Sequence, residues 1–269
     1  MVKSQSSLRE YLKNGSIGAL ALLCVGSRFI PGTDQNGPIL SAAVAYAATP
    51  RPADSTGIKT PDPLATKTVA ALRVLQNAVR HLSHPKALET AFNSYFAYTT
   101  SHPDQVTKPF LYFVDYGLPS TEPRGYVFDM RSLAVVEGPF TVAHGRGSST
   151  TQYGVPTRFS NAPGSAMTSL GLYLAEGLYA FRGHAGGQAY SSIGLRLQGV
   201  MPGYNDKALA RGVVAHGAPY VTPTKAGRSE GCPAMEQQRA QRVLPELANG
   251  AMVFLFAPEQ SLLANADGV

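Results

Sequence analysis

The stretch FLYFVDYGLPSTEPRGYVFDMRSLAVVEG, residues 110–138, decides the fold class of this chain. It holds three short runs rich in β-branched and aromatic residues, at 110–116, 125–130 and 133–138, separated by Gly, Pro and Ser. Such runs with such punctuation are typical of β-strands joined by turns. The same pattern predicts further strands downstream, at 170–177, 193–199, 212–217 and 252–257.

Upstream of these strands the apolar residues follow a helical period instead. They recur at helical spacing from 64 to 82, and Pro85 begins a second pattern of the same kind, so a helical hairpin is expected within 64–107. One more helix is expected at about 235–248. The sequence therefore predicts a mainly β chain, a β-sandwich or barrel of roughly 150 residues with an N-terminal helical hairpin.

The N-terminus has the features of an export signal. Basic residues precede the apolar stretch SIGALALLCVG (16–26), which is too short to span a membrane, and small residues follow at 43–48. Residues 1–47 are therefore expected to be a signal peptide, or an anchor associated with the membrane if they stay uncleaved. A Pro-rich linker at 48–63 would follow. The protein is expected to be exported to the periplasm or cell envelope.

Charge and cysteine content narrow the function classes. The formal net charge is +6 and the isoelectric point is near 9.3. This balance suits acidic surroundings such as a cell wall, but no run of Lys and Arg is dense enough for a nucleic-acid patch. Removal of residues 1–47 would lower the charge to +4 and take Cys24 with it. Cys232 would then be the sole cysteine, and no internal disulfide could form.

Cys232 lies in the segment GRSEGCPA, residues 227–234, and two interpretations are open. It could be an inert, buried small hydrophobe, or a nucleophile on a tight loop. A nucleophilic thiol needs a base and N–H donors for an oxyanion. Gly231 would allow close approach of a substrate, and Pro233 could begin a helix whose N-terminus favours the thiolate.

Six histidines could supply the base. His216 ends an expected strand and precedes Cys232 by a loop, so it is the preferred candidate. His144 ends another expected strand, within a second VAHG tetrapeptide at 142–145, and His184 is expected in a loop formed by the Gly-rich RGHAGGQ. The alternative for each is an ordinary hydrogen-bonded histidine at the surface or in the core. No pair has the close His-x-x-x-His or Cys-x-x-Cys spacing of familiar zinc sites, so no metal is predicted.

These residues resemble a known family. HGAPYV (216–221) followed by GRSEGCPA resembles the L,D-transpeptidase catalytic domain of the YkuD type, whose signature is a histidine, a spacer and Ser/Thr-x-Gly-Cys. The flanking blocks VAHGRGSS, LGLYLAEGLY and GAMVFLFAP resemble the murein L,D-transpeptidase subfamily. The resemblance covers about residues 108–257.

The resemblance implies a cysteine enzyme that acts on peptidoglycan. Its thiol would attack the amide after meso-diaminopimelate in a tetrapeptide stem, release D-alanine and pass the acyl group to an amine. Cys232 would be the nucleophile and His216 the base. The Gly231 and Cys232 N–H groups would form the oxyanion hole, and Ser229 would hold the histidine or the thiolate. No metal or organic cofactor is implied.

The chain departs from the wider family at Ala234, where many members carry an arginine. Its role would have to come from elsewhere, and Arg228, Arg196 and Arg146 are the candidates because they lie in the matching blocks; the alternative for each is an ordinary surface cation. The candidates for substrate binding lie in the matching blocks and are His144, Arg146, Asn161, Ser165, Arg196 and Arg228.

The catalytic domain is expected at 108–258, followed by a tail at 259–269. Two alternatives to a transpeptidase remain open. Water as the acceptor would give an L,D-carboxypeptidase or endopeptidase, depending on how well the acceptor cleft excludes it. The second alternative is a non-catalytic wall-binding module. The intact motif argues against it, since it retains His216, Ser229, Gly231 and Cys232.

Overall fold

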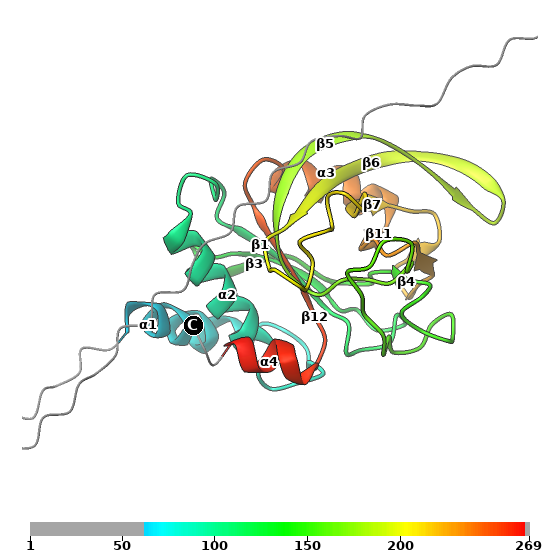
Figure 1. Ribbon diagram of the computed structural model, residues 1–269. Helices are drawn as coiled ribbons and strands as arrows, with labels where there is room; N and C mark the ends of the chain where they lie inside the picture. The colour runs from blue at the N-terminus through cyan, green and yellow to red at the C-terminus, as the bar shows by residue number, and fades with distance from the viewer. Residues whose placement is uncertain (1–61, 267–269) are drawn as a thin grey trace, which may run out of the picture. The chain divides into compact units, whose positions relative to one another are not determined.

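The computed structural model describes residues 62–266, so the expected signal segment and residues 48–61 of the expected linker lie outside it. The mainly β expectation is confirmed. Eight strands form one mixed sheet in the order β11-β7-β6-β5-β12-β1-β2-β3 (Figure 1). Their bounds are β1 Phe110–Asp115, β2 Gly125–Asp129, β3 Ala134–Phe140, β5 Gly171–Ala185, β6 Gln188–Gly199, β7 Val214–Gly217, β11 Ala234–Met235 and β12 Met252–Phe256.

Two small ladders, one parallel and one antiparallel, accompany the main sheet. The strand β4 (His144–Gly145) pairs in parallel with β10 (Arg228–Ser229), and β8 (Val221–Thr222) pairs antiparallel with β9 (Lys225–Ala226). Within the main sheet the pairs β1–β12 and β7–β11 are parallel. The β4–β10 ladder and the β7–β11 pair flank the segment that carries Cys232, which is how the fold positions the candidate site.

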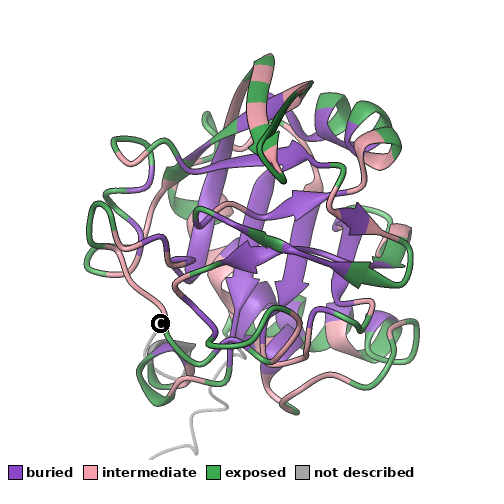
Figure 2. Ribbon diagram, turned by 90° about the vertical axis from the view of Figure 1, so that its right-hand side faces the viewer, coloured by how far each residue is buried: buried purple, intermediate pink, exposed green. Residues whose placement is uncertain are grey.

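The central strand β12 is buried throughout and β1 is buried from Leu111 to Asp115; Figure 2 shows that the buried residues gather in the strands of the main sheet. Helices cover β1 and β12, which is why their sequences read as continuous apolar runs rather than alternating ones. The helix α2 (Ala87–Ser101) packs against β1, β5 and β12, whereas α3 (Gln237–Leu247) packs against β5, β6 and β7.

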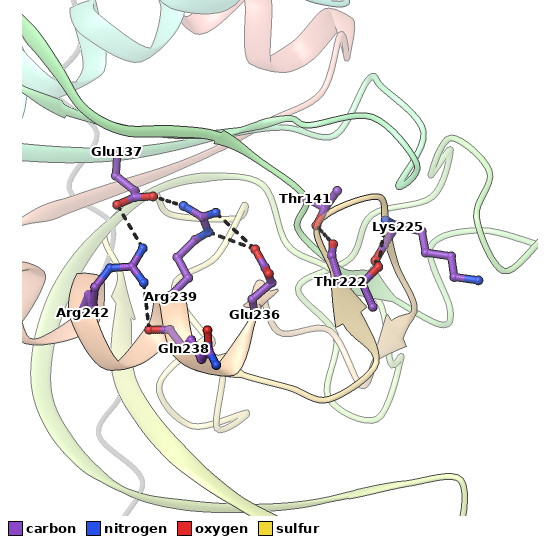
Figure 3. Close-up of polar contacts among 8 residues, drawn as sticks. All are labelled: Glu137, Thr141, Thr222, Lys225, Glu236, Gln238, Arg239 and Arg242. Atoms are coloured by element: carbon purple, nitrogen blue, oxygen red, sulfur yellow. Dashed lines mark hydrogen bonds and ion pairs between the residues drawn. The ribbon is translucent and has the colours of Figure 1, made fainter.

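The sheet curls so that its two ends meet. Just beyond β3, Ala143 N–H donates to the carbonyl of Ala234 at 2.8 Å. The side chain of Arg239 on α3 binds Glu137 on β3, and Thr141 donates to the carbonyl of Thr222 (Figure 3). This seam, made of one backbone bridge and side-chain contacts, gives the sheet its barrel-like form.

The predicted helical hairpin is present as α1 (Pro63–Leu75) and α2. Asp62 caps α1 by accepting from Leu64 N–H at 3.0 Å. The segment that joins the two helices is bonded to the sheet, because Ser83 N–H and Oγ donate to the two carboxylate oxygens of Asp115 at 2.7 and 2.6 Å. The hairpin is thus pinned to the end of β1.

Two elements differ from the sequence expectation. The expected tail at 259–269 begins with a helix, α4 (Gln260–Ala266), because Leu262 is buried in the core beside α2. The strands β5 and β6 run far past the expected 170–177 and 193–199. They meet at Gly186 and Gly187, whose φ angles of 57° and 80° suit a tight two-residue hairpin turn.

Candidate active site

The register of β7 and β11 brings the two predicted reactive residues to one place. His216 pairs with Ala234, so Cys232, two residues earlier, falls level with Val214. The Cys232 Sγ lies 4.0 Å from the carbonyl oxygen of Gly212, to which the thiol donates, and Val214 N–H also bonds to the sulfur. The thiol therefore lies against the start of the strand that carries the histidine.

The long hairpin of β5 and β6 arches over this strand (Figure 1). His216 pairs with Gly194 of β6, and directly opposed residues share a face of the sheet. On that face Phe181 of β5 stacks on the His216 ring, with ring centroids 4.1 Å apart and planes at 17°. Gly194 leaves room for Tyr179, because a Cβ there would lie 2.7 Å from the tyrosine ring.

His216 is held as a neutral base. Its Nδ1 lies 3.1 Å from the carbonyl oxygen of Gly217, and a carbonyl can only accept, so Nδ1 carries the proton and Nε2 has the free lone pair. Burial lowers the pKa of His216 to about 4, and the hydrogen bond to Gly217 opposes that shift. The imidazole is therefore unprotonated and basic at neutral pH.

Cys232 is half-buried and is a free cysteine. Burial raises the pKa of its thiol, and the Val214 N–H and the Arg211 guanidinium act in the opposite direction. The expected helix N-terminus is wrong, because β11 intervenes and α3 begins only at Gln237. Between Cys232 and His216 the described part of the chain has no hydrogen bond, so the sulfur must turn from Gly212 to reach the imidazole.

Ser229 shapes the turn that carries the thiol rather than holding the histidine or the thiolate. Its Oγ accepts from Gly231 N–H at 3.1 Å and donates to the Cys232 carbonyl at 2.7 Å. The expected oxyanion role of Gly231 N–H is thereby corrected, because that donor is already engaged. Gly231 is required for its shape: its φ is +124°, and a Cβ there would lie 2.8 Å from Met167 O.

His144 lies on β4, where it pairs with Arg228 of β10, and is fully buried, so the expected contact with substrate is corrected. Arg124, also fully buried, donates to its Nδ1 at 2.9 Å. The Nε2 atom has no partner among the described residues. Burial, followed by the charges of Arg124 and Arg228, lowers the pKa of His144 to about 3. It is a neutral core histidine under the nucleophile turn.

Arg146 and Arg228 are exposed, and both lie beside Ser229 of the turn that carries Cys232: Arg228 precedes Ser229 in the chain, and Arg146 N–H donates to the Ser229 carbonyl at 2.7 Å. Both line an open cleft with His184 at the hairpin tip and Tyr220. Arg146 Nε donates to Glu230 at 2.7 Å, and Arg228 Nη1 donates to the Ser149 carbonyl at 3.2 Å. His184 lies on β5, not in a loop as the Gly-rich sequence suggested. Two guanidinium groups are thus available to a ligand in this cleft.

Three other expected binding residues have different surroundings. Asn161 donates to Asp206 at 2.7 Å and accepts from Lys207 N–H at 3.2 Å, so its amide braces a loop. Ser165 Oγ accepts from Arg211 at 3.3 Å. Both side chains are engaged in internal contacts, and their expected substrate role stays a prediction. Arg196 is exposed on the face of His216, with its guanidinium 4.3 Å from the Tyr179 ring centroid.

Sequence reasoning missed Phe181, Arg211 and Arg124. The Gly-Gly pair at 186–187 is a hairpin signal, and reading it would have extended the strand through Phe181. No sequence pattern points to the roles of Arg211 and Arg124, because most of their hydrogen-bond partners are distant in sequence.

The described residues contain no group of three or more His, Cys, Asp or Glu able to hold a metal ion. No described helix is long and apolar enough to cross a membrane.

Cys232 and the neutral imidazole of His216 thus come from neighbouring segments of one curled, mainly β sheet. The family model described as the L,D-transpeptidase catalytic domain matches residues 80–256, and the chain belongs to this family. The matched region begins before the expected domain boundary at 108 and takes in α2.

Solved L,D-transpeptidases show a weak overall likeness. One from Mycobacterium smegmatis is 14% identical over 55% of this chain and 59% of its own, with a TM-score of 0.32. One from Mycobacterium tuberculosis H37Rv is 14% identical over 55% and 57%, with a TM-score of 0.31. The chain thus spans less than two thirds of these proteins. The comparison with curated proteins gives no match.

Proposed function

We propose that this protein is a cysteine L,D-transpeptidase that acts on peptidoglycan stem peptides, with Cys232 as nucleophile and His216 as general base. The observation that carries this proposal is the β7–β11 register, which pairs His216 with Ala234 and sets Cys232 against the start of β7. Family membership supplies the reaction class.

The chemistry would run in two halves. His216 Nε2 takes the thiol proton as Sγ attacks the carbonyl carbon between meso-diaminopimelate and D-alanine. The C–N bond then breaks, the proton passes from His216 to the departing amine, and D-alanine leaves a thioester on Cys232. An acceptor amine attacks that thioester and gives its proton to His216. The thiolate departs and regains the proton, so the enzyme ends unchanged.

Proton transfer and attack should be closely coupled. Both groups rest in their neutral forms, because burial raises the pKa of Cys232 and lowers that of His216. A stable thiolate–imidazolium pair is therefore disfavoured before substrate binds. The resting S–H bond to Gly212 must also break, and contacts of this kind commonly tighten only in the complex with substrate.

The surroundings suit an anionic peptide. Stem peptides carry carboxylates, and the cleft lined by Arg146 and Arg228 offers two guanidinium groups next to the nucleophile turn. Arg196 is exposed on the His216 face as a further cation.

Of the two N–H groups first considered as donors to the oxyanion, Cys232 N–H is the remaining candidate. Because peptidoglycan lies outside the cytoplasm, the proposed substrate also requires export, which the sequence of residues 1–47 favours.

The test compares the full-length chain with Cys232→Ala and with Cys24→Ala as a matched control. Each is incubated with a disaccharide-tetrapeptide, and the products are analysed by mass spectrometry. We expect loss of D-alanine with formation of a cross-linked dimer for the parent and for Cys24→Ala. The Cys232→Ala variant should be slower by at least about a thousandfold, as expected for removal of a catalytic nucleophile.

Equal activity of Cys232→Ala and parent would show that the nucleophile is wrongly assigned. Monomeric tripeptide as the only product would contradict the transferase and favour hydrolysis, with water as the acceptor.

A further inference from the structure

We infer that Arg211 is the positioning residue of the nucleophile turn and the cation that acts on Cys232, in place of the arginine missing at Ala234. The inference rests on the proposed function only in naming Cys232 the nucleophile. Arg211 belongs to neither the motif nor its flanking strands: it lies in the loop between β6 and β7, just before Gly212.

The first observation is that all four hydrogen bonds of the Arg211 fork go to one segment. Nη1 donates to the carbonyl of Ser160 at 2.8 Å and to Ser169 Oγ at 3.0 Å. Nη2 donates to the carbonyl of Met167 at 2.8 Å and to Ser165 Oγ at 3.3 Å. A planar fork with several donors fixes geometry in a way that a lysine ammonium cannot. Arg211 therefore sets the position of residues 160–169.

The second observation is that this segment abuts the nucleophile turn. A Cβ on Gly231 would lie 2.8 Å from Met167 O, which is also an acceptor of Arg211, and 3.6 Å from Arg211 Nη2. A Cβ on Gly145, in the strand paired with β10, would lie 2.4 Å from Ala166 O. There is no spare room between the segment and the turn, so movement of residues 166–167 must move Gly231 and, with it, Cys232.

The third observation is that Arg211 acts on the thiol from the other side as well. The next residue, Gly212, has a φ of +69° and supplies the carbonyl that accepts the Cys232 S–H. The guanidinium charge also lowers the pKa of Cys232 against the effect of burial. One residue thus braces the segment behind the turn, supplies the favourable charge that acts on the thiol, and directly precedes the residue whose carbonyl accepts the resting S–H.

The other groups around the thiol do not supply that charge. Glu230, on the turn itself, raises the pKa of Cys232, and His216 on β7 is neutral at pH 7. Five tyrosines on β5, β6 and the loops after β1 and β7 interact electrostatically with Cys232, but they are neutral at this pH and supply no charge. They are Tyr116, Tyr173, Tyr179, Tyr190 and Tyr220.

The test measures the pH dependence of Cys232 alkylation by iodoacetamide in the full-length chain, quantified on the Cys232 peptide by mass spectrometry. In Arg211→Gln we expect the pH midpoint to rise by about one unit, which corresponds to about tenfold slower alkylation at neutral pH. Arg211→Lys should keep a midpoint near that of the parent, because the charge remains, but should lose at least about fivefold in transpeptidation kcat, because the fork is gone.

Lys207→Gln is the matched control, since it removes an exposed positive charge from the same loop; its midpoint should equal that of the parent. A folded Arg211→Gln with an unchanged midpoint would overturn the inference. If Arg211→Gln does not fold, the test rests on Arg211→Lys. A transpeptidation kcat of Arg211→Lys equal to that of the parent would overturn the inference. Alkylation needs no peptidoglycan, so it tests the inference apart from the proposed function. If the midpoints are as expected but the protein has no transpeptidase activity, the proposed function is contradicted and the inference is not.

Discussion

Burial sets the protonation of the residues on which the chemistry depends. Phe181 covers one face of the His216 ring, and removal from water is the main reason that the pKa of His216 falls to about 4. The base is therefore fully available at neutral pH, at the cost of a lower intrinsic basicity. The stacked ring also fixes the plane in which Nε2 points, since Nδ1 is already bonded to Gly217.

Phe181→Ala tests this effect at the residue scale. Loss of the ring admits water to His216, so its pKa should rise from about 4 toward the ordinary value near 6.5, by at least about one unit. The measurement is an NMR titration of the His216 ring. Phe181→Leu, which keeps an apolar cover, should show a smaller shift. An unchanged titration in Phe181→Ala would mean that the stacked ring does not cause the low pKa.

At the scale of elements, the seam between β3 and α3 replaces an ordinary strand ladder. Arg239 binds Glu137 across the seam and Glu236 on its own side, at 3.2 Å, and its guanidinium lies 4.6 Å from the Phe140 ring centroid (Figure 3). The side chains of Arg239 and Glu137 are only 19% and 25% exposed. Their attraction is therefore screened less than that of a surface pair.

A double-mutant cycle on Glu137→Gln and Arg239→Gln, measured by urea denaturation, should give a coupling free energy of about 1 kcal/mol. The comparison pair is Glu230→Gln with Arg146→Gln, whose side chains are 71% and 60% exposed. That surface pair should couple more weakly than the pair at the seam, because water screens it. Equal coupling for the two pairs would show that burial at the seam adds nothing.

At the scale of the whole molecule, two buried histidines make the fold sensitive to acid. The pKa of His144 is lowered to about 3 and that of His216 to about 4, both mainly by burial. The unfolded chain, with ordinary histidine pKa values near 6.5, binds these protons first. Stability is therefore fully present above about pH 6.5 and is lost as the pH falls toward 4 and then 3.

His144→Gln should weaken this dependence, because the amide oxygen can still accept from Arg124 while the titrating ring is gone. Each histidine contributes a slope of up to about 1.4 kcal/mol per pH unit in that window. Urea midpoints at pH 7, 5 and 4 should therefore fall less steeply in the variant than in the parent. His184→Gln, at an exposed position, is the control and should follow the parent. A variant as steep as the parent would contradict this account.

The candidate pair and most strands could be predicted because their signals are local. The runs at 110–116 and 252–257 are apolar because both strands are buried in the core, and His216 with Ser229, Gly231 and Cys232 forms a short motif. The hairpin of β5 and β6 was underestimated because a shift of register between Ala175 and Leu178 interrupts the alternation. Beyond it, the strand faces solvent and loses its apolar signature.

By itself, the sequence determined the mainly β class and the helical hairpin, and it singled out the candidate reactive pair, since periodicity and motif spacing depend on neighbours along the chain. Only the tertiary structure decided what surrounds that pair. Arg211, Phe181 and the buried Arg124–His144 contact come together from positions far apart in sequence. The hydrogen bond from Gly231 N–H to Ser229 is local, but it too was found only in the structure, because the motif does not specify the conformation of the turn. The physical reason is that charge, burial and hydrogen bonding act through space, whereas a sequence pattern records only separation along the chain.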